Sequence, residues 1–138
     1  MIQLILKFIP AIIWAFIIAV LCLLPQSAFY NPEFLHKLPL DKIAHFTMFF
    51  ILSILVWLGM KITNYKAVKI PKYSILLVIL ILLLYGGITE LAQNILTKTR
   101  HTEFLDFLAD CAGILAGLFF YLLIKRRKIS NQKEFVKY

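Results

Sequence analysis

The chain has 138 residues, of which 62% are hydrophobic, and its formal net charge is +8. This apolar excess over an ordinary soluble domain predicts a membrane protein. Because the basic residues flank apolar runs and form no aromatic-interleaved module, the charge indicates contact with membrane lipids and argues against a nucleic-acid partner.

Four apolar stretches are long enough to cross a bilayer as helices, which takes about 20 residues each. In chain order they cover roughly residues 3–24, 42–60, 73–94 and 105–124. A backbone in lipid must satisfy its own hydrogen bonds, so each stretch is predicted to be helical. The first is expected to be a retained helix, since its apolar run is long for a signal peptide. The sequence therefore predicts an all-α, four-transmembrane-helix bundle over residues 1–124, with a basic tail at 125–138.

Lysine and arginine predict how the bundle is oriented. The link between the second and third stretches carries four lysines and no acid, and the C-terminal tail is also basic. Both are therefore expected on the cytoplasmic side. The other two links mix acidic and basic residues and are expected outside. Four spans then leave both termini in the cytoplasm, in a multi-pass protein of the cytoplasmic membrane.

Polar residues of the last three stretches fall at one predicted height. They are Asp41, His45, Glu90, Gln93, Asp106 and Asp110. Counted upward from the cytoplasmic lysines, they stand roughly 22 to 32 Å high for straight helices. That is the outer edge of a hydrocarbon core about 30 Å thick. Residues spaced by about four share a helix face, and polar faces turn toward the bundle interior. Gly86, Gly113 and Gly117 continue these faces and are predicted helix-packing positions.

This layer predicts a polar pocket that opens to the outside and suits an anionic, amphiphilic ligand. The candidate catalytic residues are Asp41, His45, Glu90 and Asp106, and the candidate ligand-binding residues are Lys42, Gln93, Arg100 and Asp110. An imidazole beside a carboxylate can exchange a proton with a substrate. A guanidinium such as that of Arg100 can hold a phosphate through two hydrogen bonds.

Three segments carry a resemblance to the VanZ-like family: DKIAHF at 41–46, ELAQ at 90–93 and RHTEFLDFLAD at 100–110. The family pattern has D-K-x-x-H at the start of one span and E-x-x-Q at the end of the next. An arginine, an aspartate six residues later, an asparagine four after that and glycines follow. The resemblance covers roughly residues 10–124 and implies a cell-envelope membrane protein linked to resistance against teicoplanin, a lipid-bearing antibiotic that binds cell-wall precursors.

Asp110 departs from that pattern, because the family usually has asparagine there. The change adds a carboxyl group to the predicted pocket. A buried extra carboxyl group is expected either to hold its proton or to pair with His45 or Arg100.

The leading prediction is an integral membrane protein that binds or processes an anionic lipid or lipid-linked cell-wall precursor at the outer leaflet, with catalysis and oligomeric state left open. One alternative is a polar network that only holds the helices in register, at about 1 kcal/mol for each hydrogen bond. A metal site is a further alternative, since carboxylates and histidine are plausible ligands. The motif Glu-x-x-His is absent, however, and Lys42 and Arg100 would compete, so neither metal nor cofactor is expected.

Overall fold

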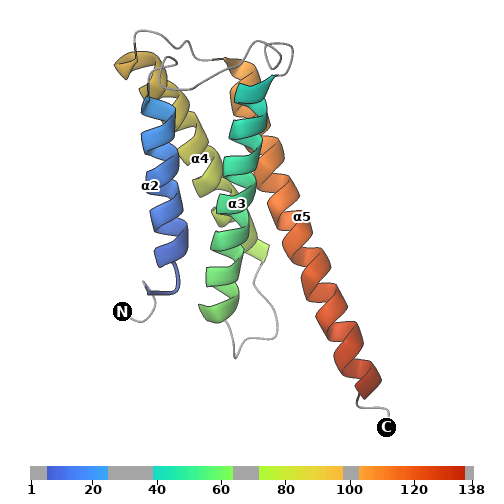
Figure 1. The fold of residues 1–138 in the computed structure, drawn as a ribbon. Coiled ribbons are helices and arrows are strands. Elements are labelled where there is room, and N and C mark those ends of the chain that lie inside the picture. Colours follow the sequence, from blue (N-terminus) through green and yellow to red (C-terminus); the bar gives the residue numbers. More distant parts are fainter. Residues whose placement is uncertain (1–5, 25–38, 64–71, 98–102, 136–138) are drawn as a thin grey trace.

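The computed structural model describes residues 6–24, 39–63, 72–97 and 103–135. Within these ranges the chain forms four helices and no strand: α2 (Ile9–Leu23), α3 (Leu40–Thr63), α4 (Lys72–Leu96) and α5 (Phe104–Phe135). Successive helices run in opposite directions, so α2 begins and α5 ends at the same end of the bundle (Figure 1). The predicted all-α architecture with four helices is confirmed.

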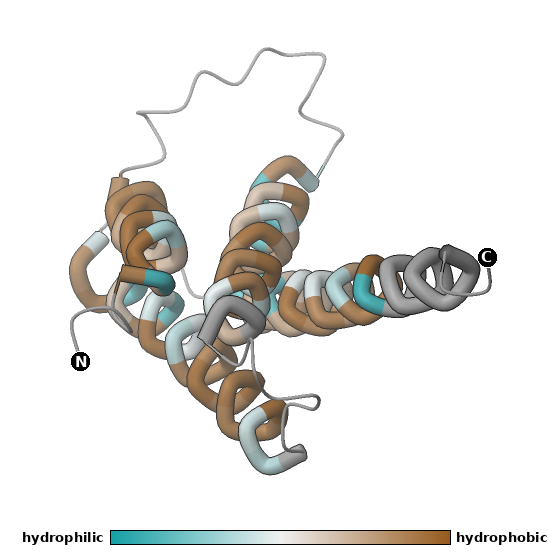
Figure 2. Tube along the Cα trace, turned by 90° about the horizontal axis from the view of Figure 1, so that it is seen from below, coloured by the Kyte–Doolittle hydropathy of each residue, from teal (hydrophilic) through white to brown (hydrophobic). Residues whose placement is uncertain are grey.

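Three of the helices are long and apolar enough to cross a membrane. These segments are Leu40–Met60, Tyr73–Leu96 and Phe104–Lys125. Large apolar side chains such as Phe16, Leu84 and Phe119 are exposed on the outer faces of the helices, and apolar residues cover most of their length (Figure 2). Side chains of this kind are solvated by lipid better than by water. The prediction of a membrane protein is thus supported.

Two helix boundaries differ from the prediction. Helix α2 has 15 residues, and at about 1.5 Å per residue it is about 22 Å long, shorter than a typical hydrocarbon core. It begins at Ile9 rather than near residue 3, with Pro10 in the first turn, where a missing N–H breaks no helical hydrogen bond. Helix α5 continues to Phe135 rather than ending near 124, because residues 125–135 contain neither glycine nor proline and are rich in good helix formers.

Helices α3 and α5 pack with their backbones in close contact. A Cβ atom at Gly113 would overlap the carbonyl oxygen of Phe46, and one at Gly117 would lie 2.6 Å from the Cβ of Ser53. The Ser53 hydroxyl also donates a 2.9 Å hydrogen bond to the carbonyl of Ile114. Glycine at these two positions therefore sets the distance between the helices, as small residues commonly do in membrane bundles.

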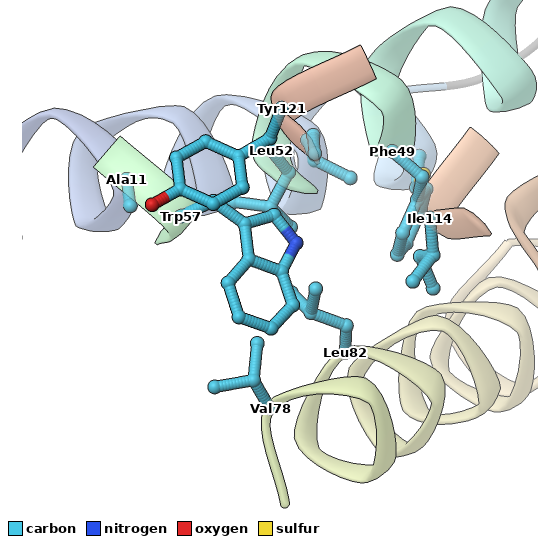
Figure 3. Close-up of a cluster of buried hydrophobic side chains, with 10 residues drawn as sticks. Ala11, Phe49, Leu52, Trp57, Val78, Leu82, Ile114 and Tyr121 are labelled. Atoms are coloured by element: carbon cyan, nitrogen blue, oxygen red, sulfur yellow. The ribbon is translucent and has the colours of Figure 1, made fainter. Parts of the chain in front are cut away.

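The apolar core joins all four helices (Figure 3). Trp57 of α3 stacks on Tyr121 of α5, with ring centroids 5.9 Å apart. Two hydrogen bonds attach α2 to its neighbours: the Trp14 indole donates to the Met48 carbonyl at 2.9 Å, and the Tyr85 hydroxyl donates to the Ala15 carbonyl at 2.5 Å. These contacts fix how the four helices pack against one another.

Candidate functional site

Three ionisable side chains from three helices meet at one end of the bundle. His45 lies near the start of α3, Glu90 near the end of α4 and Asp110 near the start of α5. Nδ1 of His45 is 3.0 Å from Oδ1 of Asp110 and 3.4 Å from Oε1 of Glu90. All three residues are almost completely buried, with 1%, 3% and 0% of their surfaces exposed. We call His45, Glu90 and Asp110 the buried trio.

Glycines make room for the buried trio. A Cβ atom at Gly86 would lie 3.2 Å from Oδ2 of Asp110 and 3.4 Å from the ring of Phe49. A side chain there would crowd the carboxylate, so glycine lets α4 approach α5. The Thr89 hydroxyl donates a 2.8 Å hydrogen bond to the Gly86 carbonyl, three residues earlier in α4. Gly113 follows Asp110 by one helical turn. Because it has no side chain, this part of α5, including Asp110, can lie close to α3.

Two polar atoms of the buried trio have no hydrogen-bond partner in the part of the chain that the structure describes. They are Nε2 of His45 and Oδ2 of Asp110. A buried polar atom without a partner costs roughly 1–3 kcal/mol. Such atoms are therefore candidates for contact with a bound ion, water or ligand.

A second polar cluster borders the buried trio at the same end of the bundle. Nζ of Lys42 is 2.6 Å from Oε2 of Glu103 and 3.2 Å from Oδ1 of Asp106. We call these three residues the rim cluster. Asp106 is buried, whereas Glu103 is exposed. The hydrogen bond from Lys42 holds the pKa of Glu103 below its ordinary value. Lys42, predicted to bind an anionic ligand, is thus already paired with two carboxylates.

The remaining predicted site residues are placed as follows. Asp41 is exposed, and one of its carboxylate oxygens lies within 4.8 Å of a His45 ring nitrogen and an Asp106 oxygen. Gln93 is buried, one turn beyond Glu90 on α4. Arg100 lies outside the described residues. Of the alternatives expected for Asp110, the structure has the contact with His45, since the carboxylate at hydrogen-bond distance from the imidazole is that of Asp110.

Sequence reasoning did not assign Glu103, Ser53 or Thr89 to any contact at this interface. Glu103 contacts Lys42 and Ser53 donates to the Ile114 carbonyl, whereas the Thr89 hydroxyl donates to the Gly86 carbonyl within α4. The partners of Glu103 and Ser53 are 61 residues away in the sequence, so no spacing rule within a helix could identify them. The one sequence signal for Glu103 is its place directly before the start of α5, at the same end of the bundle as Lys42.

A separate apolar cavity of about 530 Å³ lies between α2, α3 and α4. It extends from Phe8 to Tyr85, and its walls are almost wholly hydrocarbon. The Tyr85 ring lies 5.9 Å from that of Phe49, which in turn lies against Gly86 beside Asp110. These two aromatic rings stand between the cavity and the buried trio.

Comparisons with known proteins give no match. No family model matches the chain, and neither a curated protein nor a solved structure is similar enough to be matched. The VanZ-like resemblance therefore continues to rest on the three sequence segments that carry it, at 41–46, 90–93 and 100–110.

Proposed function

We propose that this chain is a multi-pass protein of the cytoplasmic membrane that binds or processes an anionic lipid or a lipid-linked cell-wall precursor. The observation that carries the proposal is the buried trio, a group of ionisable side chains gathered from three span-length helices at one end of the bundle. Ionisable groups within membrane spans are costly and usually mark functional sites. Two of its polar atoms are available to a ligand.

The depth of the buried trio suits the headgroup of an amphiphile. His45 is five residues from the start of its span, Glu90 is six from the end of its own and Asp110 is six from the start of α5. These offsets correspond to about 7–9 Å below the span ends. A polar headgroup can reach that depth from the membrane surface, while its acyl chains lie against the exposed apolar faces of the helices.

The charge needed for an anionic headgroup comes from the rim. Lys42 is partly exposed and can exchange its carboxylate partners for a phosphate. The sequence supplies two more cations, Lys98 and Arg100, in the link that joins α4 to α5. Arginine binds phosphate with two parallel hydrogen bonds, so Arg100 is the proposed anion contact.

The proposed orientation places this end of the bundle outside the cell. It requires α2 to serve as a fourth span, and the alternating helix directions support both termini on one side (Figure 1). Single cysteines in a chain whose Cys22 and Cys111 are replaced by alanine test the orientation. An impermeant reagent should label residues 28–38 and 97–102 in intact cells, but not 62–70. The reverse pattern would contradict the proposal.

Anion selectivity is tested by the lipids that co-purify with the full chain. After reconstitution in mixtures of phosphatidylglycerol and phosphatidylcholine, wild type should retain phosphatidylglycerol preferentially. Arg100→Ala and Lys42→Ala should lose this preference. Lys125→Ala, at the opposite end of the α5 span, serves as the control and should keep it. An equal lipid ratio for all four proteins would contradict an anionic ligand.

The VanZ-like resemblance adds one cellular readout to this proposal. A host that expresses the chain should become less susceptible to teicoplanin if the family link extends to this protein. Glu90→Gln should abolish the effect at the same expression level. An unchanged susceptibility with wild type would remove the resistance component and leave the lipid-binding proposal to the other tests.

The alternative is a polar layer that serves only helix packing. The His45–Asp110 contact supports it, because a hydrogen bond there joins α3 to α5. Yet Ser53 and the two glycines Gly113 and Gly117 already join the same helices. Packing alone therefore does not account for a second carboxylate, that of Glu90, beside the imidazole.

A further inference from the structure

We infer that the buried trio is a binding site for a divalent first-row transition-metal ion, held by the His45 imidazole and the carboxylates of Glu90 and Asp110. One ligand atom from each residue lies within 4.8 Å of the other two. The inference concerns a site within this chain and does not depend on the identity of any lipid ligand.

The distances within the buried trio fit a metal centre. Metal–nitrogen and metal–oxygen bonds in such sites are about 2.0–2.2 Å long. Two ligand atoms at that distance are about 3.0 Å apart at a right angle and about 3.4 Å apart at a tetrahedral angle. Nδ1 of His45 is 3.0 Å from Asp110 and 3.4 Å from Glu90. Small side-chain rotations would therefore complete the coordination.

The environment of Asp110 supports a cation as its partner. The residue is completely buried, and its Oδ2 atom makes no hydrogen bond with any described residue. An ionised carboxylate in such a place is costly unless a charge or a metal neutralises it. Gly86 has no side chain to crowd Oδ2, since a Cβ atom there would lie 3.2 Å from it.

One of the two cations expected to compete with a metal, Lys42, is engaged elsewhere. Lys42 was predicted to oppose a metal ion, but its ammonium is ion-paired with Glu103 and Asp106 in the rim cluster. The same ion pair argues against the neighbouring group Asp41, His45 and Asp106 as the site. Its Asp106 already has a cation, and its Asp41 is exposed to solvent.

The ligand set indicates the class of metal. Imidazole suits zinc, iron and copper, whereas Ca²⁺ takes six to eight oxygen ligands and Mg²⁺ keeps several waters. Carboxylate oxygens in turn suit Mn²⁺, so one nitrogen and two carboxylates favour Zn²⁺ or Mn²⁺. Three protein ligands leave coordination positions open. If the proposed function holds, a phosphate oxygen of the headgroup can occupy one of them, and the ion would offset the negative charge of the cluster.

The test is the metal content and metal affinity of the full chain purified in detergent, without added lipid. Wild type from cells grown with Zn²⁺ and Mn²⁺ should carry close to one equivalent of one of them by elemental analysis. Glu90→Gln and Asp110→Asn keep the side-chain shape but remove a charged ligand, and should lower the affinity at least about tenfold. Ser53→Ala, which removes a buried hydrogen bond of the same α3–α5 interface, should retain the metal.

Two outcomes would overturn the site. One is wild type that carries no Zn²⁺ or Mn²⁺ and takes up neither on titration. The other is equal retention by wild type, Glu90→Gln and Asp110→Asn. Replacement by Co²⁺ gives an independent optical readout, whose absorption bands should appear with wild type and be lost in Asp110→Asn. Because the metal is measured without added lipid, a negative result would leave the lipid-binding proposal to its own tests.

Discussion

Nδ1 of His45 and Oδ1 of Asp110 lie 3.0 Å apart across the interface of α3 and α5, and both residues are buried. Asp110→Ala leaves the imidazole without this partner and should destabilise the fold by about 1–3 kcal/mol. Asp110→Asn keeps an oxygen that accepts the same hydrogen bond and should cost much less. Thermal unfolding of the metal-free proteins in detergent measures both. Equal destabilisation by the two substitutions would contradict a hydrogen bond at this position.

The close approach of α3 and α5 predicts opposite effects of alanine at two glycines. At Gly113 the new Cβ would overlap the Phe46 carbonyl, so Gly113→Ala should force the helices apart at a cost of about 1–3 kcal/mol. At Gly87 the nearest atom, in the Phe107 ring, is 3.9 Å away, and alanine favours helix by up to about 1 kcal/mol. Gly87→Ala should thus be neutral or stabilising. The same loss of thermal stability for both variants would exclude the packing described for Gly113.

The rim cluster predicts a stability difference that depends on pH. The folded pKa of Glu103 is lowered from 4.5 by the hydrogen bond from Lys42. Its contribution is therefore fully present above pH 4.5 and is lost as pH falls through the lower folded value. Wild type should melt slightly above Glu103→Gln at neutral pH, and the difference should vanish in acid and shrink in high salt. A difference that persists at the lowest pH would assign the effect to something other than this ion pair.

The hydrogen bond from Tyr85 to Ala15 predicts how firmly α2 is attached. Tyr85→Phe removes only the hydroxyl and should weaken the docking of α2 by about 0.5–1.5 kcal/mol. Cys22 on α2 is 2% exposed, so its alkylation by a membrane-permeant maleimide should become several-fold faster. Cys111 on α5 is the internal control and should react at the wild-type rate. Unchanged labelling of Cys22 would contradict a contribution of the Tyr85 hydroxyl to the docking of α2.

Apolar length was sufficient to predict the three segments long enough to cross a membrane. Their apolar runs match the length that a bilayer requires, so the predicted boundaries of α3 and α4 lie within three residues of those observed. The common depth of His45, Glu90 and Asp110 followed from the constant rise of a helix. These features depend on residues close together in the chain, so they can be predicted from a single sequence.

The pairings within the site could not be predicted in this way. Whether His45 meets Asp41 or Asp110 depends on how closely α5 approaches α3, which the backbone contact at Gly113 decides. From the sequence, Lys42 could equally have faced a ligand. In the structure its ammonium lies 2.6 Å from the Glu103 carboxylate, directly before α5. Distances between helices are set by packing over the whole interface, so they cannot be predicted from the spacing of residues along one helix.

Native mass spectrometry of the full chain, released from gently washed detergent micelles, tests most directly whether the buried trio holds a ligand. The comparison uses wild type, Glu90→Gln and the control Ser53→Ala, each with its thermal unfolding midpoint measured in parallel. We predict a phosphate-bearing lipid adduct on wild type and Ser53→Ala that is lost from Glu90→Gln while that variant stays folded. The same bare mass for all three proteins, or the same adduct on all three, would contradict a ligand site at the buried trio.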